Sequence, residues 1–250
     1  MGGNRMRKFL KISALLAVIL LVGGFAGFYF WSQFTYDGTD QLETLVPIDE
    51  IDVVDNWLVL TPEEKAKGGI VLYPGAKVEP AAYRYYAQGL ADAGYLVVIP
   101  QMTFNFAIFN QNIAEDVMEQ YPEIKNWYVE GHSLGGVAAS GFAYTHQEEI
   151  SGVILLGSYP ADSTDFSDTD MPMLSLFAEH DGLTTPEKID ETKSLLSTDV
   201  LLHQIEGGNH TGFGMYGSQK GDKSATISVK DQQDEMIKTT TVWLKKYDKE

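Results

Sequence analysis

Short apolar runs alternate with helical segments over most of this chain, and this alternation constrains the fold more than any other feature of the sequence. The runs at 95–99, 152–156 and 173–178 are almost continuously apolar and show no polar alternation. Strands of this kind are covered on both faces, as in parallel sheets. Because such strands alternate with helices, we predict an α/β domain with a mostly parallel central sheet and helices on both faces.

The predicted elements follow one another from about residue 57 to the C-terminus. Strands are expected at 57–60, 69–73, 95–99, 127–130, 152–156, 173–178 and 200–205, and helices at 80–93, 112–120, 134–146, 186–196 and 230–247. Only 16 residues, 157–172, separate two neighbouring strands. That interval is too short to hold a cap domain, so we expect an open site.

The first 31 residues differ in composition from the rest of the chain. Four cationic residues, Arg5, Arg7, Lys8 and Lys11, precede 20 uncharged residues at Ile12–Trp31. At about 1.5 Å per residue, a helix of this length spans roughly 30 Å, the hydrocarbon thickness of a bilayer. The basic flank predicts that the N-terminus stays in the cytoplasm and that the residues after Trp31 are exported.

Two interpretations of this segment remain open. The aromatic belt at 28–31 and the length of the apolar run favour a retained single-pass signal anchor, whereas Gly24 and Ala26 would suit a cleaved signal peptide. We expect a membrane protein with an extracellular C-terminal domain, or a secreted one after cleavage. The chain is divided accordingly into a cytoplasmic stub and anchor at 1–31, a tether at 32–47 and the α/β domain at 48–250.

Charge and cysteine content exclude several function classes. The formal net charge is −17, and the cationic N-terminus leaves an even more acidic remainder. Nucleic acid is therefore not an expected partner, because phosphate binding needs clustered cations. Cysteine is absent, which excludes disulfides, cysteine-ligated metal sites and a cysteine nucleophile.

A serine lies among closely spaced glycines at a predicted strand-to-helix junction. The sequence Gly131-His132-Ser133-Leu134-Gly135-Gly136 follows one strand and opens the next helix. This is the context of the G-x-S-x-G nucleophile elbow, in which a tight turn lifts the serine hydroxyl above the sheet edge. Glycines at 131 and 135 are a steric requirement of such a turn. The alternative is an ordinary glycine-rich helix start.

A serine hydroxyl needs a base to accept its proton, and the chain contains five histidines. His132 lies inside the elbow, with its side chain expected to point away from the hydroxyl, while His146 ends a helix and His203 lies within a strand. His180 is the serious rival. His210 is the favoured base, because it lies in a glycine-rich loop after the last strand, from which an imidazole can reach Ser133.

The base in turn needs a carboxylate that orients it. Asp181 directly follows the strand at 173–178 and is the favoured candidate, while Glu179 lies too close to that strand. Aspartates in the preceding loop are interpreted as solvated turn formers; they are Asp162, Asp165, Asp168 and Asp170. An oxyanion hole would use the backbone N–H of Leu134 and, in the loop after the strand at 69–73, that of Ala76.

With these residues the chain resembles the α/β-hydrolase superfamily, and more narrowly the bacterial alpha/beta hydrolase family that is distantly similar to dienelactone hydrolases. The resemblance spans roughly residues 50 to 245, and the order Ser133, Asp181, His210 is that of α/β-hydrolases. It rests on Tyr73–Val78, Ala82-Tyr83, Leu90–Tyr95, Gly131–Gly136, Asp181–Leu183 and Gly207–His210. The nucleophile here is serine rather than cysteine, which weakens any transfer of a lactone substrate.

The expected function is hydrolysis of carboxylic esters by a Ser-His-Asp triad, without a metal or an organic cofactor. Apolar side chains at Phe104, Phe106 and Phe213, with Ile108 and Phe109, suit a small-molecule ester with a short acyl or aromatic group. For residues 104–109, a helical core role is the alternative. An exported serine peptidase and a membrane-tethered, non-catalytic binding protein on the same scaffold also remain open.

Overall fold

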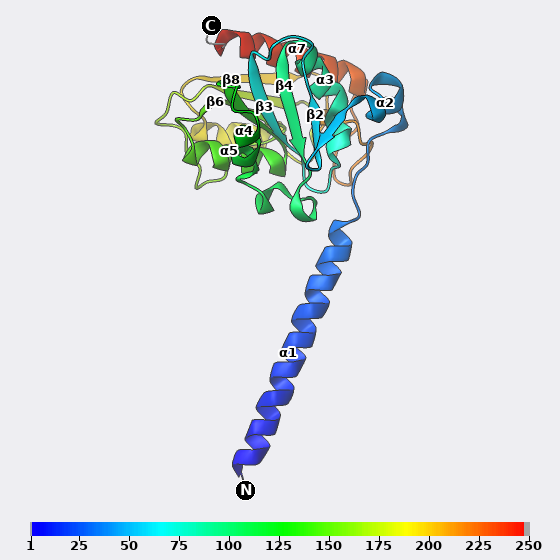
Figure 1. Ribbon diagram of the computed structural model, residues 1–250, viewed down its shortest axis with the longest axis vertical. Coiled ribbons are helices and arrows are strands. Elements are labelled where there is room, and N and C mark those ends of the chain that lie inside the picture. Colours follow the sequence, from blue (N-terminus) through cyan, green and yellow to red (C-terminus); the bar gives the residue numbers. More distant parts are fainter. Residues whose placement is uncertain (1, 248–250) are drawn as a thin grey trace. The chain divides into compact units, whose positions relative to one another are not determined.

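The computed structural model describes residues 2–247 and divides into two compact units, Met1–Thr35 and Tyr36–Glu250. The first unit consists mainly of one helix, α1 (Gly2–Ser32; Figure 1). Its segment Met6–Ser32 contains an 18-residue stretch with a mean hydropathy of 2.3, and no residue of that stretch is buried. By length and composition this helix could cross a membrane or serve as a signal sequence.

The second unit is built on one eight-stranded sheet in the order β1-β2-β4-β3-β5-β6-β7-β8 (Figure 1). Neighbouring strands pair in parallel along the series β4, β3, β5, β6, β7 and β8. Strand β2 pairs antiparallel with both β1 and β4. The predicted mostly parallel sheet is therefore confirmed. The strands are β1 (Asp52–Val54), β2 (Trp57–Leu60), β3 (Gly68–Tyr73), β4 (Tyr95–Pro100), β5 (Trp127–His132), β6 (Ile150–Leu156), β7 (Met173–Ala178) and β8 (Val200–Ile205).

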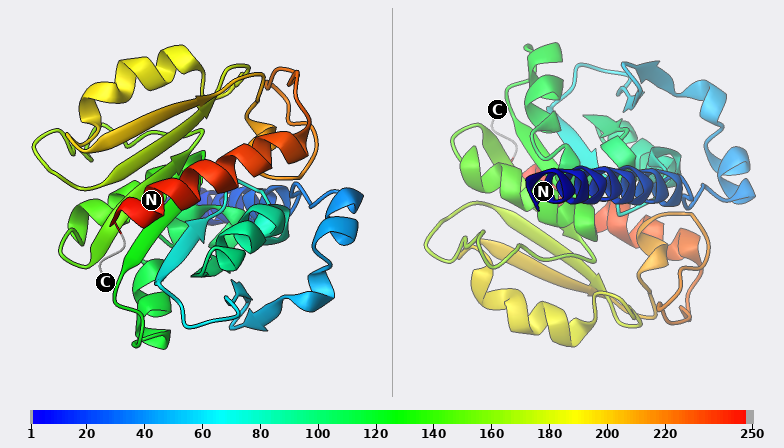
Figure 2. Two further views of the ribbon diagram at one scale, coloured as in Figure 1. Left: turned by 90° about the horizontal axis from the view of Figure 1, so that it is seen from above. Right: turned by 90° about the horizontal axis from the view of Figure 1, so that it is seen from below.

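Helices cover both faces of the sheet, because each face buries its own apolar cluster. One cluster includes Tyr86 and Trp243 of α3 and α7, and the other includes Val117 and Phe142 of α4 and α5. Figure 2 shows α3 and α7 side by side. The helices are α2 (Asp40–Leu45), α3 (Arg84–Asp92), α4 (Ile113–Gln120), α5 (Leu134–Thr145), α6 (Pro186–Thr192) and α7 (Val229–Tyr247), with short 3-10 turns η1 (Ile48–Glu50), η2 (Pro80–Tyr83), η3 (Thr103–Asn105), η4 (Ala107–Phe109), η5 (Lys193–Leu195) and η6 (Thr211–Phe213).

Most predicted elements form, with shifted ends. Strand β5 continues to His132, beyond the predicted end at Glu130, because its parallel pairing with β6 extends through Gly131 and His132. The buried carboxyl of Glu130 is accommodated by the Tyr86 hydroxyl, which donates a 2.6 Å hydrogen bond to it. The interval 157–172 forms neither helix nor strand, in agreement with the expected absence of a cap domain.

Residues 36–47 pack into the α/β unit, although the sequence suggested a polar tether over 32–47. The Tyr36 N–H donates to the Lys77 carbonyl at 2.7 Å, and Leu42 of α2 is completely buried. The Arg84 side chain donates to the Val46 carbonyl at 2.7 Å and pairs with Glu43. The compact unit thus begins at Tyr36 rather than at residue 48, because sparse apolar residues of this segment find partners that only the tertiary fold supplies.

Replacing Leu42 by alanine tests whether this segment is part of the folded unit. We expect the free energy of unfolding to fall by about 2–5 kcal/mol, because the lost methyl groups leave a buried cavity. Leu201→Ala is the control: Leu201 is 47% exposed, so its loss should cost no more than about 0.5 kcal/mol. Equilibrium urea unfolding of the detergent-solubilised chain measures both, and equal effects would mean that 36–47 is a free tether.

Candidate active site

The turn between β5 and α5 holds Ser133 in a strained backbone conformation. Ser133 has φ 52° and ψ −122°, a region that non-glycine residues rarely occupy. Hydrogen bonds on both sides hold it there: its N–H donates to the Leu156 carbonyl at 3.0 Å, and its own carbonyl accepts from the Ser158 hydroxyl at 2.6 Å. The surrounding structure therefore over-determines the strain, as is common at functional sites.

Two glycines are sterically required at this turn. A Cβ atom on Gly131 would lie 2.3 Å from the Gly135 carbonyl carbon, and one on Gly135 would lie 2.1 Å from the Tyr73 carbonyl oxygen. Both contacts are with backbone and cannot be relieved by a side-chain rotation. Because Gly135 has no side chain, the start of α5 can approach the end of β3 directly.

A buried histidine–aspartate pair lies at the carboxyl ends of β7 and β8. His210 Nδ1 is 2.7 Å from Asp181 Oδ2, and the two side chains are 1% and 0% exposed. The other carboxylate oxygen, Oδ1, accepts the N–H groups of Leu183 at 2.8 Å and Thr184 at 2.6 Å. Since an ionised carboxylate only accepts hydrogen bonds, Nδ1 carries the proton and Nε2 of the neutral imidazole is left as a base.

The serine turn and the histidine–aspartate pair meet at the same edge of the sheet. The ring of His132, the residue before Ser133, has its centroid 4.6 Å from that of His210. On the other side, a Cβ on Gly157, next to Leu156, would lie 3.1 Å from Asp181 Oδ2. Within residues 2–247 the His210 Nε2 atom is buried without a hydrogen-bond partner, so its lone pair is not committed to another protein group.

The loop after β3 leaves one backbone donor unused. The Gly75 N–H donates to the Tyr83 hydroxyl at 2.9 Å, the Lys77 N–H to the Asn105 carbonyl at 2.7 Å, and the Val78 N–H to the Gly75 carbonyl at 3.1 Å. In the described part of the chain, no hydrogen bond uses the N–H of Ala76 or of Leu134, the first residue of α5. Because the Gly135 backbone touches the end of β3, these two donors belong to adjacent turns.

Comparison with known proteins identifies the family of this chain. Residues 69–234, more than half of the chain, match the profile described as "Alpha/beta hydrolase family". The chain belongs to this family. No curated protein sequence matches it significantly.

Solved structures of several α/β hydrolases share the fold at low sequence identity. MGS-MChE2, an alpha/beta hydrolase enzyme from a sediment metagenome of the Mar Chica lagoon, superposes with a TM-score of 0.61 at 17% identity, over 80% of this chain and 100% of the other. The Paleococcus ferrophilus monoacylglycerol lipase gives 0.58 at 14% identity, over 75% and 98%. Est1E from Butyrivibrio proteoclasticus gives 0.57 at 13% identity, over 78% and 98%.

The apolar residues predicted to line the hydrolase site lie in two different environments. Phe213 is completely buried and has its ring centroid 5.7 Å from that of His132. Phe104 lies in η3 and Phe106 between η3 and η4; both are half-buried, and their rings contact that of Phe109. Within 104–109, Ala107 belongs to the core and the aromatic side chains do not, while their role in substrate binding stays a prediction.

The other histidines have different partners. His203 Nε2 is 2.7 Å from Glu235, and the His146 ring stacks on Phe142 with centroids 4.1 Å apart. His180, the rival base, is partly exposed and has Glu179 3.9 Å away. Glu179 itself accepts the Gly207 N–H at 2.8 Å. Of the five histidines, His210 alone is bonded to a buried carboxylate.

Two residues near the site were not predicted to act there. The His132 ring lies against that of His210, and its expected direction away from the serine hydroxyl stays a prediction. Asp222 accepts N–H groups from Gly182 at 3.0 Å, His210 at 3.3 Å and Thr211 at 2.9 Å, so it ties the two loops of the histidine–aspartate pair together. An aspartate beside a glycine is common in turns, and no sequence pattern distinguishes this one.

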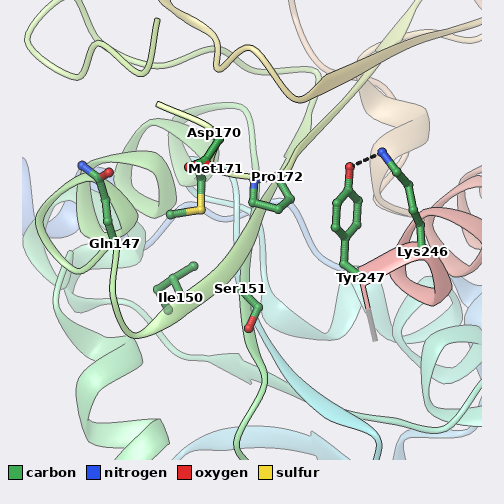
Figure 3. A pocket seen from close by; sticks show the side chains of 8 residues that line it. All are labelled: Gln147, Ile150, Ser151, Asp170, Met171, Pro172, Lys246 and Tyr247. Atoms are coloured by element: carbon green, nitrogen blue, oxygen red, sulfur yellow. Dashed lines mark hydrogen bonds between the residues drawn. The ribbon is translucent and has the colours of Figure 1, made fainter. Parts of the chain in front are cut away.

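A separate depression of about 430 Å³ lies away from these residues (Figure 3). It borders Ile150 at the start of β6 and Pro172 just before β7, so it lies toward the amino ends of the strands, whereas Ser133 follows the carboxyl end of β5. Lys246, in its lining, donates to the Tyr247 hydroxyl at 2.6 Å. Within residues 2–247 no cluster of three or more His, Asp or Glu side chains could hold a metal ion.

Glu130, on the strand that leads to Ser133, is a completely buried acid. Burial raises its pKa from 4.5 to about 8, against the opposing effect of the Tyr86 hydrogen bond. Between these two values the folded protein keeps a proton that the unfolded chain releases. Because the folded state then binds more protons, the free energy of unfolding falls as pH rises through this interval.

Glu130→Gln should flatten this pH dependence, because glutamine still accepts from Tyr86 but does not titrate. The difference in the free energy of unfolding between variant and wild type should therefore increase steadily, in favour of the variant, from pH 5 to pH 8. Urea unfolding at several pH values measures the slope. Glu149→Gln, at an exposed glutamate, is the control, and an unchanged slope in Glu130→Gln would contradict the assignment.

Proposed function

We propose that this α/β hydrolase is a serine esterase that cleaves carboxylic esters with Ser133 as nucleophile, His210 as base and Asp181 as the group that orients the base. The observation that carries the proposal is the buried 2.7 Å bond between His210 Nδ1 and Asp181. Nε2 is buried without a hydrogen-bond partner among residues 2–247, the Ser133 hydroxyl included, at the edge of the sheet where the strained Ser133 lies.

In the first half-reaction, Ser133 Oγ attacks the ester carbonyl carbon while its proton passes to His210 Nε2. The carbonyl oxygen becomes an oxyanion, which the free N–H groups of Ala76 and Leu134 would stabilise by about 3 kcal/mol each. Asp181 stabilises the imidazolium that forms. The tetrahedral intermediate then expels the alcohol, which takes the proton from Nε2, and an acyl-serine remains.

In the second half-reaction, water replaces the alcohol. His210 Nε2 accepts a proton from the water as its oxygen bonds to the acyl carbon, and it returns this proton to Ser133 Oγ when the acyl–serine bond breaks. The products are a carboxylic acid and the regenerated enzyme. Each step uses only groups of the chain and water.

A small-molecule ester with a short acyl or aromatic group is the proposed substrate. The interval 157–172 forms no cap, and Phe104, Phe106 and Phe213 lie in segments that follow the carboxyl ends of β4 and β8, as Ser133 follows that of β5. One structural neighbour is described as a monoacylglycerol lipase, a carboxylic ester hydrolase, which supports the ester class.

Labelling by a fluorophosphonate probe tests the nucleophile. We expect the wild type to react and Ser133→Ala to lose all labelling, because the probe requires an activated serine hydroxyl. Hydrolysis of p-nitrophenyl esters should fall by more than about 1,000-fold in the same variant. Ser194→Ala, which changes an exposed serine of η5, should keep the labelling.

Three outcomes of this experiment separate the candidate functions. Hydrolysis of the esters with no cleavage of matched peptide amides supports the esterase. Preferential cleavage of the amides would indicate a serine peptidase. Absence of labelling and of turnover in a folded wild type would leave a non-catalytic binding protein and contradict the proposal.

We further propose that α1 is retained as a single-pass anchor, with the hydrolase unit outside the cytoplasm. Support comes from the cationic residues before the apolar run and from its aromatic end at Tyr29–Trp31.

Carbonate extraction and protease protection test this topology. The full-length chain should stay in the membrane pellet after extraction at high pH, and protease added outside intact cells should digest the hydrolase unit. A shortened, soluble protein that begins within or just after the apolar run would instead show that the segment is a cleaved signal peptide.

A further inference from the structure

A buried tyrosine hydroxyl lies directly beneath the loop that carries the Ala76 N–H. Tyr83, at the end of η2, is completely buried. Its hydroxyl accepts the Gly75 N–H at 2.9 Å and lies 2.8 Å from His132 Nδ1. Three segments that are distant in the sequence, the loop after β3, η2 and the end of β5, therefore meet at this one oxygen.

The direction of these two bonds defines the state of His132. Because the Tyr83 oxygen accepts from Gly75, its own proton is available for His132 Nδ1, and the structure gives it no other acceptor among the described residues. With Nδ1 as the acceptor, the Tyr83 proton is satisfied, and His132 is neutral with its proton on Nε2, an atom that is buried without a hydrogen-bond partner among the described residues. Burial, followed by the neighbouring His210, holds the pKa of His132 well below its usual range, which agrees with a neutral ring.

Two hydrogen bonds hold the peptide units on either side of Gly75. The Tyr83 hydroxyl holds the Gly75 N–H, in the unit before this residue, and the Val78 N–H holds the Gly75 carbonyl, in the unit after it, at 3.1 Å. In a planar trans peptide, the carbonyl of Gly75 and the N–H of Ala76 point in opposite directions. The Val78 bond therefore sets the direction of the Ala76 N–H, which has no hydrogen-bond partner among residues 2–247, and the Tyr83 bond holds the backbone from which this unit continues.

Close packing leaves the loop little freedom to change this orientation. A Cβ on Gly75 would lie 2.8 Å from His132 Nδ1 and 3.3 Å from the Tyr83 hydroxyl. His132 also precedes Ser133 in the chain, and Leu134 follows it. The Tyr83–His132 pair thus links the turn that carries Ala76 to the turn that carries Ser133 and Leu134.

We propose that Tyr83 and His132 are positioning residues that hold the Ala76 N–H toward the oxyanion formed at Ser133, with His132 acting as a neutral hydrogen-bond acceptor. This inference rests on the proposed esterase function. Neither residue contacts the reacting atoms in this role. Their effect is on the transition state, because an ester carbonyl in the ground state needs the aligned donor much less than the oxyanion does.

Tyr83→Phe removes the hydroxyl and keeps the ring. We expect kcat for p-nitrophenyl esters to fall about 10-fold, with KM changed by less than about twofold. The inhibition constant of an alkyl boronic acid, which forms a tetrahedral adduct with the serine, should rise by a similar factor. A merely structural role would instead lower the amount of folded enzyme and leave the kcat of each active site, counted by fluorophosphonate titration, unchanged.

A matched pair at position 132 tests the acceptor. His132→Asn places an amide oxygen near the position of Nδ1 and should keep kcat within about threefold, whereas the similarly sized His132→Leu should lose about as much as Tyr83→Phe. The double variant Tyr83→Phe, His132→Leu should lose no more than either single variant, because one interaction is removed in each case. Equal losses in Asn and Leu would overturn the acceptor role.

The tautomer of His132 gives a readout that does not depend on turnover. Side-chain ¹⁵N spectra of the wild type should show His132 neutral and protonated on Nε2, and exchange of the Gly75 amide should accelerate in Tyr83→Phe. A protonated Nδ1 in the wild type, or an unchanged kcat and boronic acid affinity in Tyr83→Phe, would overturn the inference. A wild type with the expected tautomer but without serine labelling would contradict the esterase function instead.

Discussion

The close approach of two backbone segments at the end of β5 is the constraint on which the site depends. Gly131 faces the backbone of Gly135 and Gly136 across the turn, and Gly135 faces the end of β3, so neither can carry a side chain. Ser133 adopts its strained conformation inside this turn, and the loop after β3 lies next to the helix start. A larger residue at Gly135 would push the start of α5 away from the loop that carries the Ala76 N–H.

The other half of the site is held by hydrogen bonds to carboxylates rather than by regular structure. Asp181 binds His210 and two N–H groups of its own loop, Asp222 joins that loop to the histidine loop, and Glu179 holds Gly207. Buried or half-buried carboxylates that accept several N–H groups are well satisfied and need no cation. This arrangement explains how a loop rich in glycine can keep His210 oriented.

The parts of the site differed in how far they could be predicted from sequence. Ser133, Asp181 and His210 were chosen because each follows an apolar strand, and residues that follow parallel strands converge at one edge of the sheet. The Tyr83–His132 pair could not be chosen in this way, since its hydrogen bond depends on the direction of two side chains. The contacts of His132 with Tyr83 and His210 depend on segments distant in sequence, so no local pattern could indicate them.

Local pattern was sufficient for the α/β architecture, the absence of a cap between β6 and β7, the apolar helix α1 and the glycine-rich turn at Ser133, because these depend on periodicity, chain length and steric size. Tertiary structure alone decided that residues 36–47 belong to the folded unit, that Glu130 stays in the core and that Asp222 joins two loops. Each of these depends on a partner distant in sequence. Packing or hydrogen bonding with that partner holds in place a polar residue, or a segment with few apolar residues, that local pattern would leave in solvent.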